Sequence, residues 1–187
     1  GRCLKMNLPN KLAVLRIILV IPFVIILGIA LNSGNMPLEV TLRILATIIF
    51  VGAAITDYYD GQIARKYNLV TNLGKLLDPL ADKLIVISAL VVLTKYEKIS
   101  LWIVLIIIFR ELLITGLRAI VASEGNSIIH AENLGKLKTA TQFVTLSIII
   151  LFPLSMMINN ILMLIPLILT ILSGAEYMMK SKEILKK

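Results

Sequence analysis

Long apolar runs separated by short polar segments make up most of this chain. A helix needs about 20 apolar residues to cross the hydrocarbon layer of a membrane. Six stretches approach that length: 12–31, 38–56, 74–94, 99–121, 140–158 and 160–178. The pattern therefore predicts an all-α integral membrane protein with six transmembrane helices.

The predicted spans are separated by segments of turn-forming or charged residues. These segments are Asn32-Ser33-Gly34-Asn35, Lys95-Tyr96-Glu97-Lys98, Ser123-Glu124-Gly125-Asn126 and Asn159-Asn160. Pro153 and Pro166 fall inside the last two predicted spans, where neighbouring helices can satisfy the carbonyl groups that a proline frees. No repeat or linker interrupts the pattern, so we expect a single domain over residues 6–187, preceded by a vector-derived extension at residues 1–5.

The composition agrees with a membrane environment. Of the 187 residues, 58% are hydrophobic and the mean hydropathy is +0.94, which is more apolar surface than one small soluble core buries. The net charge is +8, but the basic residues lie between apolar runs, so anionic lipid headgroups are the expected partner and nucleic acid is not. Cys3 is the only cysteine, which excludes a disulfide framework and a cysteine-based metal site.

Basic residues are distributed unevenly between the two ends of the predicted spans. One end has only Arg43, Lys95 and Lys98. The other end has Lys11, Arg16, Arg65, Lys66, Lys75, Lys136, Lys138, Lys180, Lys182, Lys186 and Lys187. Because basic segments stay on the cytoplasmic side, we expect a cell-membrane protein whose termini and 57–75 and 122–139 connections are cytoplasmic.

Four aspartates lie close to two of the predicted span ends. Asp57 and Asp60 are three residues apart, and Asp78 and Asp82 are four apart, so each pair shares a helix face. Four carboxylates at one membrane mouth would repel one another unless they were protonated or held cations. Carboxylates without nearby His or Cys suit Mg²⁺ or Mn²⁺, and two such ions can hold a pyrophosphate between them.

Part of this pattern also has a purely structural interpretation. Asp78 before Pro79 is typical of a helix N-cap followed by proline at the first helical position. Asp57 and Asp60 can simply end the second span. Asp82 lies one turn deeper than a cap and precedes an apolar run, which indicates a functional carboxylate.

Small residues and an arginine lie between the two aspartate pairs. Gly61, Ala64 and Gly74 allow either two helices or a nucleotide to come close, and Arg65 can reach a phosphate or an aspartate. The full series is Asp57-x-x-Asp60-Gly61-x-x-Ala64-Arg65, eight residues, then Gly74-x-x-x-Asp78-x-x-x-Asp82. With this order and spacing, the chain resembles the CDP-alcohol phosphotransferase family.

The resemblance implies a six-helix membrane enzyme, usually dimeric, with its site open to the cytoplasm. It implies that Asp57, Asp60 and Asp78 hold two divalent cations, and that Asp82 touches one of them and acts as the catalytic base. The CDP moiety of CDP-diacylglycerol would contact the aspartates and their neighbours. Those contacts would come from Asp57, Asp60, Gly61, Ala64, Arg65, Thr71 and Gly74, with Asn10 from the amino-terminal Asn7-Leu8-Pro9-Asn10 segment.

A second charged group lies in the fourth predicted span and after it. Arg110 and Arg118 are eight residues apart, about two turns, and so face broadly the same way. Lys136 and Lys138 follow at the start of the fifth span, and Glu111 can balance only one of these cations. The charges either pair with the aspartates and lipid headgroups or bind an acceptor that carries a phosphate, which arginine recognises well.

This basic group is similar to the branch of the family that makes phosphatidylglycerophosphate, a precursor of phosphatidylglycerol. The resemblance implies transfer of a phosphatidyl group from CDP-diacylglycerol to sn-glycerol 3-phosphate, with release of CMP. The same chemistry with inositol phosphate as acceptor is an alternative. A divalent-cation transporter would also place carboxylates in a membrane, although nearer its midplane. A non-catalytic lipid-binding scaffold would leave Asp82 without a role.

Overall fold

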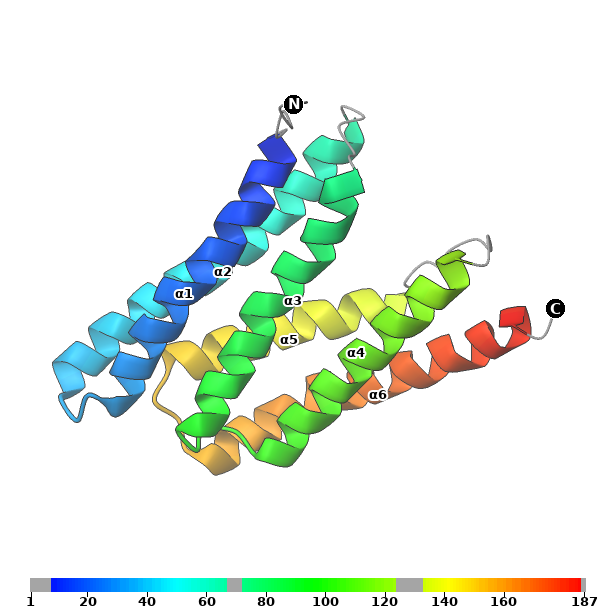
Figure 1. Ribbon diagram of the computed structural model, residues 1–187. Coiled ribbons are helices and arrows are strands. Elements are labelled where there is room, and N and C mark those ends of the chain that lie inside the picture. Colours follow the sequence, from blue (N-terminus) through cyan, green and yellow to red (C-terminus); the bar gives the residue numbers. More distant parts are fainter. Residues whose placement is uncertain (1–7, 67–71, 124–132, 186–187) are drawn as a thin grey trace. The chain divides into compact units, whose positions relative to one another are not determined.

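The computed structural model describes residues 8–66, 72–123 and 133–185, although some side chains within these ranges lie outside the description. The described chain forms six helices (Figure 1): α1 (Leu8–Asn32), α2 (Met36–Lys66), α3 (Asn72–Lys95), α4 (Leu101–Ser123), α5 (Asn133–Leu151) and α6 (Met156–Leu185). The predicted all-α class and the number of helices are confirmed. Three of the predicted breaks, after Asn32, Lys95 and Ser123, fall where helices end.

The chain divides into two compact units, and each is described by itself. The first contains residues 1–96 and 147–153, and the second contains residues 97–146 and 154–187. Helix α5 therefore contributes its last residues to the first unit and the rest of its length to the second. Whether the chain functions as one domain stays a prediction.

The first unit is built from α1, α2 and α3, with α1 packed against both other helices. Phe23 of α1 and Phe50 of α2 are fully buried, and their rings stack with centroids 5.8 Å apart. Leu90 and Leu93 of α3 are also fully buried. This packing holds the three helices side by side. In the chain, the carboxyl-terminal end of α2 is followed, after a short connection, by the start of α3.

The break between α5 and α6 differs from the prediction. Helix α5 ends at Leu151, so Pro153 lies in the connection rather than inside a span, and Asn159 and Asn160 lie inside α6 rather than in a turn. Proline has no N–H group and its ring clashes with the carbonyl four residues earlier, which ends a helix. Ser155 then caps α6, because its Oγ accepts a hydrogen bond from Ile158 N at 3.4 Å.

Asn159 and Asn160 instead join the start of α6 to the segment between α3 and α4. Asn159 Nδ2 donates to Lys98 O at 3.0 Å, and Asn160 Oδ1 accepts from Ser100 N at 2.9 Å. These side chains satisfy backbone groups that the helix ends leave free. Two asparagines that look like a turn in the sequence therefore stabilise a connection elsewhere in the second unit.

Within the first unit, the buried side chain of Arg43 of α2 caps the carboxyl-terminal end of α5. Its Nη1 donates to the carbonyls of Ile149, Ile150 and Phe152 at 3.3, 3.0 and 3.3 Å, and its Nε pairs with Glu39 at 2.7 Å. A cation at a helix carboxyl terminus also interacts favourably with the helix dipole. The sequence pattern treats Arg43 only as a charge that sets orientation, whereas the structure gives it a packing role.

Within the described residues, four helices contain segments with the length and apolarity of a membrane span. These segments are 11–32 in α1, 36–56 in α2, 134–151 in α5 and 156–181 in α6. Helix α4 has three charged residues, Arg110, Glu111 and Arg118, so apolarity alone does not mark it as a span. That α3 and α4 also cross the membrane stays a prediction.

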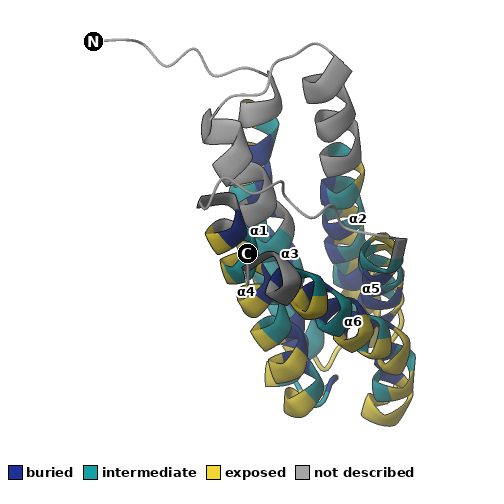
Figure 2. Cartoon of the chain, turned by 90° about the vertical axis from the view of Figure 1, so that its right-hand side faces the viewer, coloured by how far each residue is buried: buried dark blue, intermediate teal, exposed yellow. Residues whose placement is uncertain are grey.

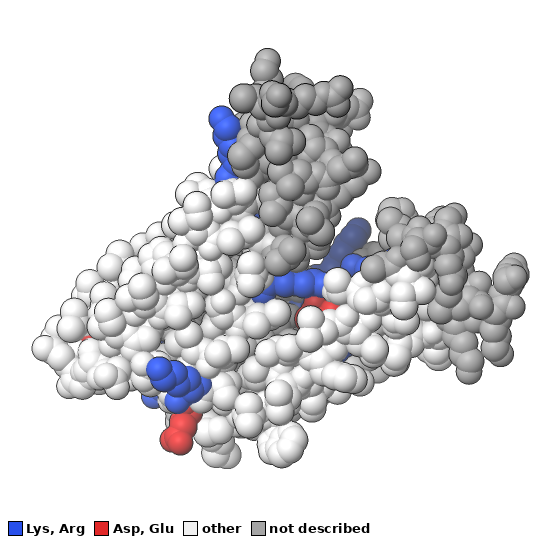
Figure 3. Space-filling model, in the orientation of Figure 1, with Lys and Arg blue, Asp and Glu red and all other residues white. Residues whose placement is uncertain are grey.

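The exposed surface is apolar in a way that soluble proteins avoid. On α4, Trp102, Phe109 and Leu112 are 74%, 69% and 65% exposed, and exposed residues also run along α6 (Figure 2). The described part of the surface in Figure 3 is mostly uncharged, with basic and acidic atoms in a few places. Apolar surface on this scale fits contact with lipid.

Candidate functional site

The four predicted metal-binding aspartates lie on α2 and α3. Asp60 is six residues before the end of α2 at Lys66, and Asp78 is six residues after the start of α3 at Asn72. Asp57 and Asp82 are nine and ten residues from the same two helix ends. Consecutive helices with matched distances from their connected ends place the backbone of the two pairs at similar heights. The side chains of all four aspartates lie outside the described residues.

The helix bounds decide the capping interpretation of Asp78. Helix α3 begins at Asn72, so Asp78 lies almost two turns inside the helix and is not its N-cap. Helix α2 continues to Lys66, so Asp57 and Asp60 do not end it. A carboxylate within a helix gains nothing from capping, so the N-cap interpretation of Asp78 is wrong. The apolar segment 36–56 of α2 stops directly before Asp57, so the interpretation that Asp57 and Asp60 end the second span stays open.

The neighbouring residues of the signature follow the same two helix faces. Gly61 and Ala64 lie four and seven residues after Asp57, which puts them on its face of α2, and Gly74 lies four residues before Asp78 on α3. Arg65 is in the last turn of α2 and Asn10 in the first turn of α1. Thr71 lies outside the described residues, as do the side chains of Asn10, Ala64 and Arg65.

The structure does not test the predicted metal site. Among the side chains that it describes, no group of three His, Cys, Asp or Glu residues could hold a metal ion. The predicted ligands are all outside that set. What the sequence provides is a donor set of four carboxylates on two adjacent helices, which fits hard cations such as Mg²⁺ or Mn²⁺.

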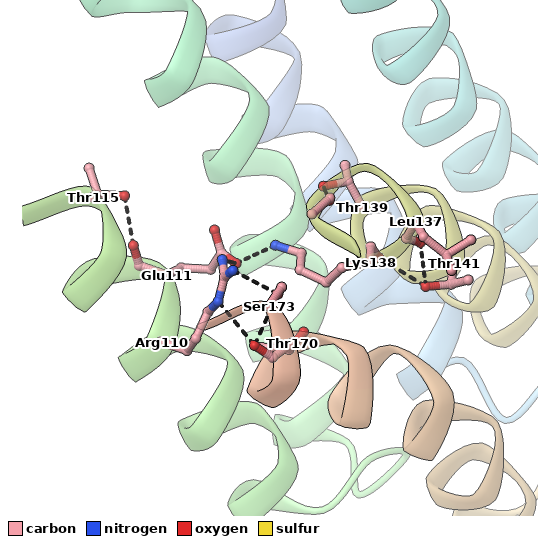
Figure 4. A network of polar contacts seen from close by, with 10 residues as sticks. Arg110, Glu111, Thr115, Leu137, Lys138, Thr139, Thr141, Thr170 and Ser173 are labelled. Carbon is pink, nitrogen blue, oxygen red and sulfur yellow. Dashed lines mark hydrogen bonds and ion pairs between the residues drawn. The ribbon is translucent and has the colours of Figure 1, made fainter. Parts of the chain in front are cut away.

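In the second unit, Arg110 of α4 is held by polar groups of α6 (Figure 4). Its Nε donates to Thr170 O at 3.2 Å, and its Nη2 donates to Ser173 Oγ at 2.8 Å. Ser173 Oγ donates in turn to Thr170 O at 3.2 Å. These contacts fix the plane of the guanidinium between α4 and α6.

Glu111 connects Arg110 to Lys138 of α5. Arg110 Nη1 lies 3.1 Å from Glu111 Oε1, and Lys138 Nζ pairs with the same oxygen (Figure 4). The three side chains are only 14%, 13% and 8% exposed, in the order Arg110, Glu111, Lys138. The two cations and Glu111 thus form one buried network, and charges in such a setting are costly unless they are paired.

Arg118 and Lys136 are placed differently from this pair. Arg118 lies over the ring of buried Tyr177, with Cζ 5.3 Å from the ring centroid, a favourable cation–π distance. No described residue accepts a hydrogen bond from Arg118 Nε or bonds to the Tyr177 hydroxyl. Lys136 is exposed at the start of α5. The structure therefore links Arg110 and Lys138 through Glu111. It confirms the prediction that Arg110 and Arg118 face the same way, because both contact α6.

The α6 partners Thr170, Ser173 and Tyr177 are functional candidates that the sequence interpretation missed. They are three and four residues apart, so they share one face of α6, and each of them meets Arg110 or Arg118 of α4. That spacing is visible in the sequence, but it is a weak signal, because single hydroxyl groups are ordinary in membrane helices.

Gly174 provides the space that the Arg110 side chain occupies. A Cβ atom at Gly174 would lie 3.2 Å from Arg110 Cγ and 3.3 Å from its Nε. We expect Gly174→Ala to lower the free energy of unfolding by about 1 kcal/mol, because the hydrogen-bonded arginine cannot move freely aside. Thermal unfolding in detergent measures this change.

Gly116→Ala on α4 is the matched control. A Cβ atom there would meet nothing within 4 Å. Since alanine favours a helix over glycine by up to about 1 kcal/mol, this variant is expected to be as stable as the parent or more stable. Equal stability of the two variants would show that Gly174 is not constrained by Arg110.

Taken together, apolar helices that bury a few charged networks define a multi-pass membrane protein of the helical class. Comparison with known proteins then makes the assignment specific: the chain belongs to the CDP-alcohol phosphatidyltransferase family, whose model matches residues 6–172. All the predicted site residues lie within this match. The α6 residues Ser173 and Tyr177 lie just beyond it.

Several curated relatives cover nearly the whole chain. The CDP-diacylglycerol–glycerol-3-phosphate 3-phosphatidyltransferase of Bacillus subtilis is 40% identical, over 96% of this chain and 97% of that protein. A protein of the same name from Rickettsia typhi is 41% identical, over 91% of this chain and 94% of its own length. A probable phosphatidylglycerophosphate synthase of Mycobacterium tuberculosis is 35% identical, over 97% of this chain and 84% of that protein.

Proposed function

We propose that this protein transfers the phosphatidyl group of CDP-diacylglycerol to sn-glycerol 3-phosphate, forming phosphatidylglycerophosphate and CMP. The observation that carries the proposal is similarity over nearly the full length to relatives named for this reaction. The aspartate signature on α2 and α3 and the cationic network of the second unit support the same reaction from the residues themselves.

The aspartates supply the reaction centre in this proposal. Asp57, Asp60 and Asp78 would hold two divalent cations, and Asp82 would be a ligand of one of them. When bound, Mg²⁺ or Mn²⁺ neutralises charge on the diphosphate. The chemistry of four carboxylates fits these ions.

Asp82 accepts the proton of the attacking hydroxyl group. The hydroxyl oxygen of glycerol 3-phosphate bonds to the β-phosphorus of CDP-diacylglycerol, which bears the lipid. The bond from that phosphorus to the oxygen bridging the two phosphates breaks, and CMP leaves with the bridging oxygen. Asp82 lies well inside α3, where a carboxylate has no capping role, and this position supports its use as a base.

Residues next to the aspartates recognise the CDP moiety. The small residues Gly61, Ala64 and Gly74 let the nucleotide approach the helix backbones. Polar contacts come from Arg65, Thr71 and Asn10, together with Asp57 and Asp60. The shared helix faces of the signature support this arrangement.

The cationic network recognises the phosphate of the acceptor. Arg110 and Lys138 converge on Glu111, and Arg118 lies over the ring of Tyr177, so three cations are gathered within the second unit. A phosphate dianion offers oxygens that suit the arginine fork. Lys136, exposed at the start of α5, draws the anion toward the site.

We further propose that the protein lies in the cell membrane with its termini and its aspartates on the cytoplasmic side, and that it forms a homodimer. The distribution of basic residues supports this orientation. Of the three basic residues at the opposite end of the spans, Arg43 is buried in the protein, so the excess of exposed basic residues at the cytoplasmic end is larger than the sequence alone indicates. The dimer rests on the family resemblance.

Acceptor turnover tests the proposal directly. The purified protein is given CDP-diacylglycerol and Mg²⁺ with glycerol 3-phosphate, inositol phosphate or serine, and CMP is measured. We expect CMP release with glycerol 3-phosphate, because its phosphate suits the cationic network and the relatives are named for it. Turnover only with inositol phosphate would contradict the proposal that glycerol 3-phosphate is the acceptor. Divalent-cation flux into vesicles without CMP release would contradict the proposal that the protein is an enzyme.

A further inference from the structure

A groove lies between the ends of α1 and α3 in the first unit. It has a volume of about 660 Å³ and is lined by the last two turns of α1, the last turn of α3 and the start of α2. Asn32, Ser33, Lys95 and Tyr96 form its polar end. None of these four residues has a part in the proposed reaction.

The groove is far from the aspartates. Lys95 is the last residue of α3, and Asp82 lies thirteen residues earlier on the same helix. At about 1.5 Å per residue, the two backbone positions are about 20 Å apart along the helix axis. A molecule at Lys95 therefore occupies a different end of this unit from the substrates of the phosphatidyl transfer.

The walls of the groove are formed by apolar side chains, and several of these side chains are about half exposed. Ile25 and Ile29 of α1 are 54% and 51% exposed, and Val91 of α3 is 52% exposed. These residues lie in or beside an apolar helix long enough to span the membrane. A hydrocarbon chain in the groove would bury all three, and each buried CH₂ group contributes favourably.

The polar end carries a positive charge that the described protein does not neutralise. Lys95 is exposed, its Nζ lies 5.4 Å from the centroid of the Tyr96 ring, and no described carboxylate pairs with it. A lysine and a tyrosine at the end of an apolar helix are typical of the level of lipid headgroups. The charge there suits an anion.

We propose that this groove binds an anionic phospholipid, with one acyl chain along α1 and the phosphate at Lys95. The side-chain amide of Asn32, which is exposed, is available as a further donor to the headgroup. An apolar peptide would fill the walls but would not use the cation, which favours a lipid over a protein partner. The site is independent of the proposed reaction.

Lipid binding to the purified full-length protein tests this proposal. Phosphatidylglycerol and phosphatidylcholine with identical acyl chains are added in detergent, and bound lipids are counted by native mass spectrometry. We expect Lys95→Gln to weaken phosphatidylglycerol binding about fivefold and to leave phosphatidylcholine binding unchanged, because one cation is lost. Lys11→Gln, which removes an exposed lysine near the other end of α1, is expected to behave as the parent protein.

A second variant tests the groove itself. Val91→Trp places a large ring among the half-exposed wall residues and is expected to lower the binding of both lipids. CMP release should remain at the parental rate in Lys95→Gln and Val91→Trp, which shows that both are folded. Unchanged phosphatidylglycerol binding in Lys95→Gln, or unchanged binding of both lipids in Val91→Trp, would overturn the proposal.

Discussion

Replacing Asp82 by asparagine is expected to lower CMP release by about 10²- to 10⁴-fold, the range typical for loss of a general base. Asparagine has nearly the same shape but cannot accept a proton from the acceptor hydroxyl. Three aspartates remain to hold the cations, so expression and most metal binding should persist. The measurements are CMP release under saturating substrates and the Mn²⁺ affinity of the purified variant.

Glu97→Gln is the control for this charge change. Glu97 is exposed just after the end of α3, at the opposite end from Asp82, and the substitution likewise removes one negative charge. Its CMP release is expected to equal that of the parent protein. Unchanged activity in Asp82→Asn would remove the proposed base, whereas loss of Mn²⁺ binding together with activity would make Asp82 mainly a metal ligand.

Replacing Arg43 by methionine is expected to lower the free energy of unfolding by about 3 kcal/mol. The change leaves the carbonyls at the end of α5 without a donor and the Glu39 carboxylate without its partner. Because Pro153 prevents the helix from continuing, no backbone N–H can replace the guanidinium. Thermal unfolding in detergent should show a melting temperature on the order of 10 °C lower.

Glu39→Gln separates the two roles of Arg43. This variant loses the ion pair but keeps the hydrogen bonds from Nη1 to the α5 carbonyls, so we expect a loss of about 1 kcal/mol or less. If Glu39→Gln and Arg43→Met were equally destabilised, the contacts with α5 would contribute nothing. Arg43→Lys should fall between them, because a single ammonium group cannot reproduce the fork.

The helices and the aspartate signature could be predicted from the sequence because both depend on local pattern. Apolar runs of about twenty residues identify membrane helices without knowledge of their neighbours. The three- and four-residue spacings of Asp57, Asp60, Asp78 and Asp82 indicate shared helix faces for the same reason. What the pattern left open was whether Asp78 caps a helix, and the start of α3 at Asn72 decides against it.

The α5–α6 break was misplaced because two signals competed. Asn159-Asn160 looks like a turn, and prolines are tolerated in membrane helices, so Pro153 was assigned to a span. The serine two residues after Pro153 is the better signal, since Ser155 caps α6. The role of the two asparagines depends on Lys98 and Ser100, about sixty residues away, which no local pattern reveals.

The partners of the basic residues were also beyond local pattern. That Arg110 and Arg118 share a face follows from their spacing, but which groups they meet depends on how α4 packs on α6. The structure shows a backbone carbonyl, a serine hydroxyl and a tyrosine ring. Arg43 illustrates the same difficulty, because its partners in α5 lie more than a hundred residues along the chain.

Helix α2 is much longer than a bilayer crossing requires. Its 31 residues extend about 46 Å, against a hydrocarbon thickness of about 30 Å. Residues 36–56 already suffice to cross, so the part from Asp57 to Lys66 continues about 15 Å further along the axis. The same straight helix thus extends from the hydrocarbon core into the membrane–water interface. A lipid substrate can therefore be bound there with its acyl chains still in the hydrocarbon and its nucleotide still in water.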